Sequence, residues 1–219
     1  MIIGITGSFG SGKTAVANMF RKYGFKVIDV DRLYHDDFYK NHPLRNRIKK
    51  EFGTLNRKEL KKIVFSDYSK LRRLNRITHP VIIKAIKTKI RKILTNSNKK
   101  TSITKKINDK HKSFNGINKK MKTDNPNVKI IVDIPLLFEA KVEKLFDRVL
   151  VVECDEKAQI SRLLKKKRYT RKEIQQIIKS QMPLKKKKKK ADFVIKNSSS
   201  LNKTELQVRK AIKSLKWQT

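Results

Sequence analysis

The sequence predicts an α/β protein of three layers, in which a five-stranded parallel sheet lies between helices. Three observations lead to this prediction. A short apolar run at residues 2–6 is followed at once by a glycine-rich segment and then by a helical pattern. Four further apolar runs of strand length occur along the chain. Helical patterns separate these runs, and strands that alternate with helices form a doubly wound parallel sheet.

The first strand leads into the segment GSFGSGKT, which runs from Gly7 to Thr14. This segment matches the P-loop pattern G-x-x-x-x-G-K-[ST] and predicts the three-layer fold of P-loop NTPases. Its glycines allow consecutive backbone N–H groups to surround phosphate oxygens, at the positive N-terminus of a helix. We expect Lys13 to reach the β- and γ-phosphates of ATP and Thr14 to place its hydroxyl on Mg²⁺. The alternative is a glycine-rich turn without a ligand.

The helix after the P-loop is predicted over residues 14–23, and Gly24 is well placed to end it. The chain has only seven glycines, and four of them lie in the first twelve positions. A glycine-poor sequence therefore concentrates its backbone freedom around the predicted phosphate site.

The second strand is predicted over residues 25–31 and ends in two carboxylates, Asp29 and Asp31. Two residues apart on an extended chain, they are expected to point to the same side. Ligands of open α/β sheets bind at the carboxyl ends of the strands, where the P-loop also emerges. One carboxylate is expected to accept a proton from an attacking hydroxyl, and the other to act through water on Mg²⁺. The alternative is that Asp31 only caps a helix that begins at Arg32.

Residues 32–94 are helical and basic, and we predict a helical subdomain that covers the substrate. Their apolar positions recur at steps of three and four, which indicates helices with one core-facing side. The pair His79-Pro80 is expected to start a helix, because proline suits the first helical turn. Taken alone, a histidine such as His79 is more often structural than functional.

Residues 95–127 lose this periodicity and are rich in Lys, Asn, Ser and Thr. We predict a low-complexity, basic insertion that is disordered or loosely folded, with a nucleic-acid-binding arm as the alternative. A buried strand follows at residues 128–134 and carries Asp133 at its end. The last two strands are predicted at residues 148–153 and 192–196.

The chain is strongly basic, with 57 Lys and Arg against 19 Asp and Glu, a formal net charge of +38 and a pI near 10.5. A field of this sign attracts polyanions, and the run of six lysines from Lys185 to Lys190 is a candidate contact for nucleic acid. The basic residues occur in nearly every helical segment rather than in one patch. We therefore expect unspecific, salt-sensitive binding to RNA and DNA rather than specific recognition.

The remaining global features predict a cytoplasmic protein that is a monomer or a small homo-oligomer. The sequence has no run of about 18 apolar residues, so no membrane span is predicted. The segment MIIGITGSFG has neither a charged n-region nor a cleavage pattern, so no signal peptide is predicted. The single cysteine, Cys154, cannot form an internal disulfide bond.

Six segments together resemble the dephospho-coenzyme A kinase family: GITGSFGSGKT, VIDVD, THP, VDIPLLFEA, RVLVVECDEKAQISRLL and SQMPLKKKKKKADFVIKNSSSL. The resemblance covers nearly all of a single kinase domain, residues 1–219, apart from the insertion. It implies ATP-dependent phosphorylation of the ribose 3′-hydroxyl of dephospho-CoA, the last step of coenzyme A synthesis. Two alternatives are another P-loop small-molecule kinase, such as a nucleoside or nucleotide kinase, and a basic nucleic-acid-binding NTPase.

The resemblance also implies roles for individual residues. Asp31 is expected to be the general base, with Asp29 supporting it or the metal, and Lys13 completes the catalytic set. The residues expected to bind ATP are Gly7, Ser8, Phe9, Gly10, Ser11, Gly12, Lys13, Thr14 and Asn197. The residues expected to bind the acceptor are His79, Pro80, Leu136, Leu137 and Glu139.

A lid over residues 159–183 is implied as well, with Arg162, Lys166 and Arg168 supplying cations to the triphosphate. Lys166 stands where the family usually has arginine, and lysine lacks the bidentate fork that arginine offers a phosphate. Arg168 is the alternative, by a shift of two residues. The resemblance also implies that the six lysines belong to a short charged helix of the enzyme, and this interpretation replaces the nucleic-acid contact.

Overall fold

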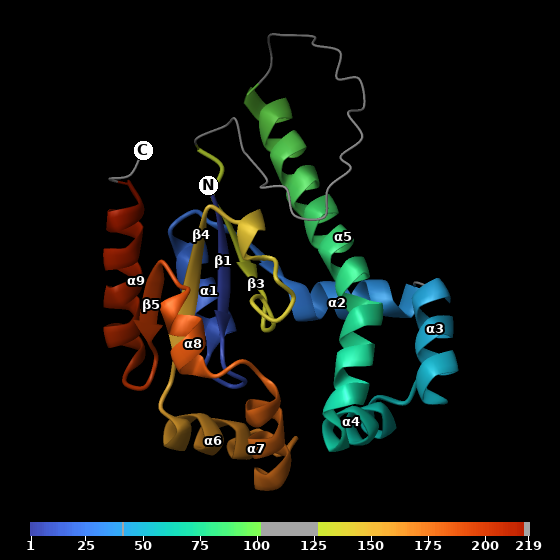
Figure 1. Ribbon diagram of the computed structural model, residues 1–219. Coiled ribbons are helices and arrows are strands. Elements are labelled where there is room, and N and C mark those ends of the chain that lie inside the picture. The colour runs from blue at the N-terminus through green and yellow to red at the C-terminus, as the bar shows by residue number, and fades with distance from the viewer. Residues whose placement is uncertain (41, 102–126, 217–219) are drawn as a thin grey trace.

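Five parallel strands form the centre of this computed structural model, which describes residues 1–40, 42–101 and 127–216 (Figure 1). The strand order is β2-β3-β1-β4-β5, so the predicted five-stranded parallel sheet is confirmed. The strands are β1 (Ile2–Gly7), β2 (Lys26–Asp29), β3 (Ile130–Asp133), β4 (Arg148–Glu153) and β5 (Phe193–Lys196).

The register of the sheet brings polar strand ends together. Strand β1 pairs with β3 and with β4, and Ile5 of β1 lies opposite Asp133 and Leu150. Strand β2 pairs with β3 so that Asp29 lies opposite Asp133. Because all five strands are parallel, the P-loop and these two carboxylates lie at one edge, the carboxyl edge of the sheet.

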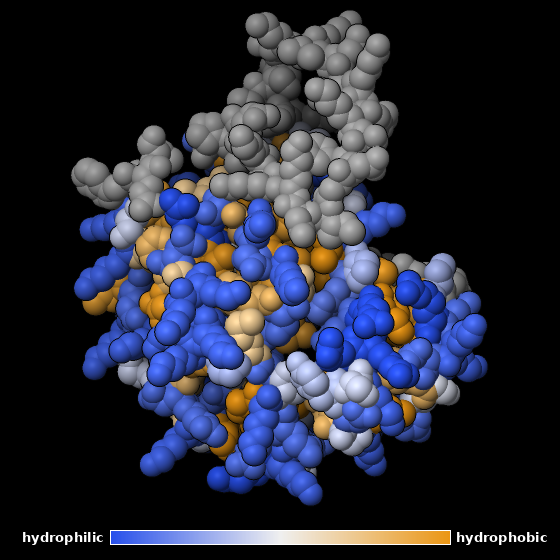
Figure 2. Space-filling model, viewed as in Figure 1, coloured by the Kyte–Doolittle hydropathy of each residue, from blue (hydrophilic) through white to orange (hydrophobic). Residues whose placement is uncertain are grey.

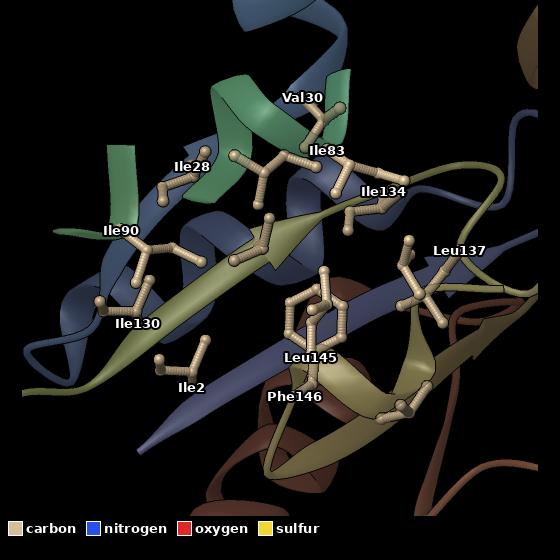
Figure 3. Packing of buried hydrophobic residues seen from close by; sticks show 14 of the residues in the cluster. Ile2, Ile28, Val30, Ile83, Ile90, Ile130, Ile134, Leu137, Leu145 and Phe146 are labelled. Atoms are coloured by element: carbon tan, nitrogen blue, oxygen red, sulfur yellow. The ribbon is translucent and has the colours of Figure 1, made fainter. Parts of the chain in front are cut away.

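Helices cover both faces of the sheet (Figure 1). Ile3 and Ile5 of β1 pack on one face with α1 and α9, while Ile2 packs on the other face against the second half of α5. Figure 3 shows the second packing, with Ile83 and Ile90 of α5 beside the sheet. The helices are α1 (Lys13–Lys22), α2 (Val30–Lys40), α3 (His42–Phe52), α4 (Arg57–Ser66), α5 (Tyr68–Thr101), α6 (Glu156–Lys165), α7 (Arg171–Ser180), α8 (Leu184–Lys189) and α9 (Leu201–Lys216), with a short 3-10 helix at Glu143–Leu145.

A second, smaller core joins α3 and the first half of α5. Leu44, Ile48 and Ile77 are buried in it, and Leu60 of α4 packs against them. The long helix α5 therefore belongs to both cores, and it holds the helical subdomain beside the sheet. Among the helices in the described part of the chain, none is long and apolar enough to cross a membrane.

Three expectations about boundaries are corrected. Pro80 does not start a helix but lies inside α5, on an exposed side, because residues from Tyr68 onward are already helical and packed. Residues 95–101 continue α5 and so do not belong to the predicted insertion, whose residues 102–126 lie outside the described part. Strand β2 ends at Asp29, and Asp31 lies in the first turn of α2 rather than on an extended chain.

Candidate active site

The P-loop turns at two glycines with left-handed backbone geometry, Gly10 (φ 79°) and Gly12 (φ 87°). A side chain at Gly12 would also clash with the amide of Asn197. The loop is closed by a hydrogen bond from the N–H of Ser11 to the carbonyl of Ser8, 3.1 Å long. The ammonium of Lys13 donates to the same carbonyl at 3.0 Å, and only 9% of Lys13 is exposed.

Three side-chain amides from other elements hold this loop. Gln159 of α6 donates to the hydroxyl of Ser8 at 2.9 Å and also to the carbonyl of Phe9. Gln181 accepts a hydrogen bond from the N–H of Phe9 at 2.9 Å. Asn197, just after β5, donates to the carbonyl of Ser11 at 2.9 Å. Gln159 and Gln181 were not expected as site residues, because nothing local in the sequence indicates contacts across more than 150 positions.

Asn197 therefore lies behind the P-loop rather than in the cleft wall. It is 3% exposed, and its carbonyl oxygen accepts from the hydroxyl of Thr204 at 3.1 Å. The guanidinium of Arg162 donates to its backbone carbonyl at 2.7 Å. These bonds fix Asn197 against the loop, so it can act on a nucleotide by shaping the loop that binds it.

Asp133 is the polar end of β3 and a candidate site residue that the sequence expectations left out. Its Oδ2 accepts a hydrogen bond of 2.9 Å from the hydroxyl of Thr14, and its Oδ1 is buried without a partner in the described structure. Burial raises the pKa of Asp133 to about 6, against the lowering effects of Lys13 and the Thr14 bond. The sequence could have indicated Asp133 as a site residue, because it lies at the end of a predicted parallel strand, as Asp29 does.

Thr14 and Asp133 fit Mg²⁺ chemically. Both offer oxygen atoms, which this hard cation prefers, and Mg²⁺ commonly takes one or two carboxylates together with substrate phosphates. The unpartnered Oδ1 of Asp133 is a buried acceptor beside the P-loop threonine. The described residues contain no group of three or more carboxylate, imidazole or thiol ligands that could hold a metal by themselves. The substrate phosphates must therefore complete such a site.

The two carboxylates after β2 have different surroundings. Asp29 Oδ1 accepts a hydrogen bond of 3.0 Å from the N–H of Arg32, so Asp29 rather than Asp31 caps α2. Asp31 lines the cleft together with Lys13 and Asp133. Burial raises its pKa, Lys13 opposes this shift, and the charge of Asp29 adds to it. Burial likewise lowers the pKa of the Lys13 ammonium, although Asp133 and Asp31 counteract it.

A cleft of about 1810 Å³ lies over the P-loop. It is bordered by Phe9, Gly10, Gly12, Lys13 and Thr14, and on its other sides by α5, by the segment after β3 and by the lid. Gly7, Ser8 and Ser11, which were also expected to bind ATP, do not line the cleft. The volume is ample for a nucleotide and a second substrate.

Three of the five expected acceptor residues line the cleft: His79, Leu136 and Glu139. His79 Nε2 is buried without a partner in the described structure, and burial lowers the pKa of its imidazole while Glu139 opposes the shift. The other two do not line the cleft. Leu137 is 0% exposed and packs in the core against Gly4, and Pro80 is on the exposed side of α5. Leu137 and its neighbour Phe138 are both buried in the turn after β3, whereas Leu136 and Glu139 are only partly buried.

The segment expected to form the lid comprises α6, α7 and the turn between them. All three expected cations, Arg162, Lys166 and Arg168, line the cleft. Tyr169 in the turn packs edge-on against Phe9 of the P-loop, with ring centroids 5.2 Å apart. The hydroxyl of Tyr169 accepts a hydrogen bond of 3.1 Å from Lys61 of α4. The lid thus touches both the P-loop and the helical subdomain.

The fold and the cleft define a P-loop kinase: a phosphate-binding loop, two carboxylates at the neighbouring strand ends and a cationic lid. A sequence model of the dephospho-CoA kinase family matches residues 1–106 and 111–203. The chain is 36% identical to the dephospho-CoA kinase of Carboxydothermus hydrogenoformans, over 99% of the chain and 95% of that protein. It is 35% identical to that of Fusobacterium nucleatum, over 92% and 91%. The chain belongs to the dephospho-CoA kinase family.

Solved structures agree on the fold. The chain is similar to a crystal structure from Thermus thermophilus with a TM-score of 0.68 and 27% identity, over 98% of this chain and 96% of that one. It is also similar to the dephospho-CoA kinase from Campylobacter jejuni, with a TM-score of 0.57 and 24% identity over 98% and 96%. At the latter identity the likeness concerns the fold alone.

Proposed function

We propose that this chain transfers the γ-phosphoryl group of ATP to the ribose 3′-hydroxyl of dephospho-CoA, with Asp31 as the general base. The observation that carries the proposal is the shared position of Asp31 and Lys13 at the floor of one cleft, in a member of this family. The carboxylate of Asp31 can accept the proton of the acceptor hydroxyl, and the ammonium of Lys13 can stabilise the transferring phosphoryl group.

Asp31 is a better candidate for the base than Asp29. A base must reach the proton that it removes, and Asp31 lines the cleft whereas Asp29 does not. The Oδ1 of Asp29 is also engaged by the N–H of Arg32. The raised pKa of Asp31 supports the same choice, because a carboxylate with a higher proton affinity is a stronger base. Asp29 supports the base through its charge and through the start of α2.

The transferring group is stabilised by cations around it. Lys13 bonds the P-loop carbonyl of Ser8 and lies where it can exchange this bond for a phosphate oxygen. Arg162, Lys166 and Arg168 add positive charge from the lid side of the cleft. Thr14 and Asp133 would hold Mg²⁺, which when bound neutralises charge on the β- and γ-phosphate oxygens. His79, Leu136 and Glu139 contribute the acceptor side of the cleft.

The experiment measures ADP release from ATP with and without dephospho-CoA, and identifies the product by mass and by the position of the new phosphate. It compares the wild type with Asp31→Asn and, as a matched control, with Asp29→Asn, since asparagine also caps helices. We expect acceptor-dependent turnover that falls by about 10² to 10⁴ in Asp31→Asn and is largely kept in Asp29→Asn. Turnover that ignores dephospho-CoA but rises with RNA would contradict the proposal.

Further expectations concern the surroundings of the enzyme. Figure 2 shows hydrophilic side chains spread over the visible face rather than gathered in one patch. The formal net charge of +38 supports unspecific, salt-sensitive contact with polyanions. The buried, free Cys154 is in keeping with a cytoplasmic location. The oligomeric state, a monomer or a small homo-oligomer, stays a prediction. Sedimentation would test it by measuring the mass of the protein in solution.

A further inference from the structure

The cleft wall formed by α5 carries two arginines for which the reaction described so far has no use. Arg72 and Arg76 line the cleft, and so do Tyr68, Asn75 and His79. Tyr68, Arg72, Arg76 and His79 follow one another at steps of three or four, and Asn75 lies three residues after Arg72 and four before His79, so these positions share one side of the helix. The wall is therefore a stripe that begins at Tyr68, which is 66% exposed, and ends at the partly buried His79.

Neither arginine of this stripe has a carboxylate within ion-pair distance among the described residues. Their neighbour Arg73 differs. Its Nη1 lies 3.1 Å from Oε1 of Glu51 on α3, and Arg73 does not line the cleft. Thus, of these three arginines, the one that does not line the cleft is paired with a carboxylate, and the two that line the cleft are available to an anion from outside the protein.

The position of this α5 stripe relative to Asp31 determines which of the two substrates the stripe contacts. Val30, the residue before Asp31, packs in the same cluster as Ile83 of α5, one turn beyond His79 (Figure 3). The base therefore lies beside the middle of α5. With a rise of about 1.5 Å per residue, Arg76 and Arg72 lie roughly 10 and 16 Å from Ile83 along the axis. They flank the route from the base to the mouth of the cleft.

The acceptor, dephospho-CoA, carries a negatively charged group that can reach these two arginines. In dephospho-CoA the reacting hydroxyl is on the ribose, and the 5′ carbon of the same ribose carries a diphosphate and then the pantetheine arm. The P-loop serves the phosphates of ATP, so the acceptor diphosphate needs cations of its own. Two guanidinium groups one turn apart offer forked donors to such a group.

We propose that Arg72 and Arg76 bind the 5′-diphosphate of dephospho-CoA and thereby select an acceptor that carries it. This proposal rests on the proposed function, because it needs the ribose hydroxyl at Asp31. Tyr68, at the exposed start of the stripe, then lies beside the pantetheine arm. Arg73 has no part in binding, although it has the same charge and lies between the two.

Binding rather than turnover tests this assignment, so that its failure is distinguishable from failure of the reaction. Calorimetry is carried out at moderate salt with the P-loop saturated by a non-hydrolysable ATP analogue. The ligands are dephospho-CoA, ADP-ribose, which keeps the diphosphate but lacks pantetheine, and adenosine, which lacks both. The proteins are the wild type, Arg72→Gln/Arg76→Gln, Arg72→Lys/Arg76→Lys and Arg73→Gln, each checked by thermal unfolding.

We expect the Kd of dephospho-CoA and ADP-ribose to rise about 10- to 100-fold in the double glutamine variant. The Kd of adenosine changes less than about twofold, since it lacks the group that the arginines hold. The Kd of the double lysine variant should lie between that of the wild type and that of the double glutamine variant, because lysine keeps the positive charge but cannot donate two parallel hydrogen bonds. An equal loss for adenosine, an equal loss in Arg73→Gln, or unchanged binding of dephospho-CoA would each overturn the proposal.

Discussion

Lys187 is fully buried, and its ammonium lies 2.9 Å from Oε1 of Glu139 in the segment after β3. It also donates to the carbonyl of Pro135 at 3.3 Å. The same Glu139 oxygen accepts from the N–H of Met182 at 2.9 Å, so one carboxylate joins α8 and the chain before it to a wall of the cleft. Of the six consecutive lysines, only this one is buried. The run thus forms most of a short charged helix, as the resemblance to the family implied. Its ion pairs, that of Lys187 and one of 2.7 Å between Lys188 and Glu153, were not expected.

Replacement of Lys187 is expected to destabilise the protein, because it leaves Glu139 partly buried without its partner. We expect Lys187→Met to lower the free energy of unfolding by about 2 to 4 kcal/mol, as measured by urea denaturation. Lys189→Met, at an exposed position of the same helix, is the control and should stay within about 0.5 kcal/mol of the wild type.

A double variant separates the ion pair from simple loss of packing. Lys187→Met/Glu139→Gln has no unpaired charge left, and glutamine can still accept from the N–H of Met182. It should therefore recover part of the lost stability. If the two single losses simply added, the ion pair would not be the cause.

A feature of this fold or site could be predicted from the sequence where residues close together in the chain determine it. The five strands are predictable because their apolar runs are short and separated by helices, and the P-loop because its spacing is fixed by phosphate chemistry. The contacts of Gln159, Gln181 and Lys187 are not predictable, because their partners lie far away along the chain. Pro80 misleads for a related reason: packing of α5 on two cores outweighs the hydrogen bond that proline removes.

The acid limb of the pH–rate profile should respond in opposite directions to two charges near Asp31. Protonation of the base stops proton transfer, so activity falls as the pH falls through the pKa of Asp31. Asp29 raises this pKa and Arg57 lowers it. Asp29→Asn should therefore move the acid limb to lower pH, and Arg57→Gln should move it to higher pH. The measurement is kcat/KM for dephospho-CoA across the acid range, and shifts in the same direction would contradict Asp31 as the titrating base.

Asp133 should make the protein less stable as the pH rises. Its pKa is about 6 in the folded protein, against an ordinary value of 3.8, so the folded state binds the proton more tightly than the unfolded chain does. The favourable contribution is fully present below pH 3.8 and is lost as the pH rises through about 6, a change of about 3 kcal/mol at most.

Asp133→Asn removes this titration while keeping an acceptor for the hydroxyl of Thr14. The difference in unfolding free energy between variant and wild type should therefore grow in favour of the variant from pH 4 to pH 7, about 3 kcal/mol at most. Because both proteins share all other titrating groups, the difference isolates Asp133. A difference that is constant over this range would show that its carboxylate titrates normally.

Gln159 should act on ATP through the shape of the P-loop. Its amide is 3% exposed and holds both the hydroxyl of Ser8 and the carbonyl of Phe9. Gln159→Leu leaves these groups without that donor, and we expect kcat/KM for ATP to fall about 10- to 100-fold. Gln176→Leu, on the exposed side of α7, is the matched control. Equal effects on ATP and dephospho-CoA would indicate general damage rather than a loosened loop.

A substitution at Lys166 tests the lid through an expected increase in kcat. Lys166 lies at the end of α6 and lines the cleft, at the position where the resemblance to the family led us to expect arginine. A guanidinium can donate two parallel hydrogen bonds to a phosphate, so Lys166→Arg should raise kcat by roughly 3- to 10-fold, a modest share of a charge-assisted bond. Arg168→Lys distinguishes the two lid positions. If Lys166→Arg brings no gain and Arg168→Lys lowers kcat sharply, Arg168 already supplies the fork, and the shift of two residues is the correct alignment of this lid.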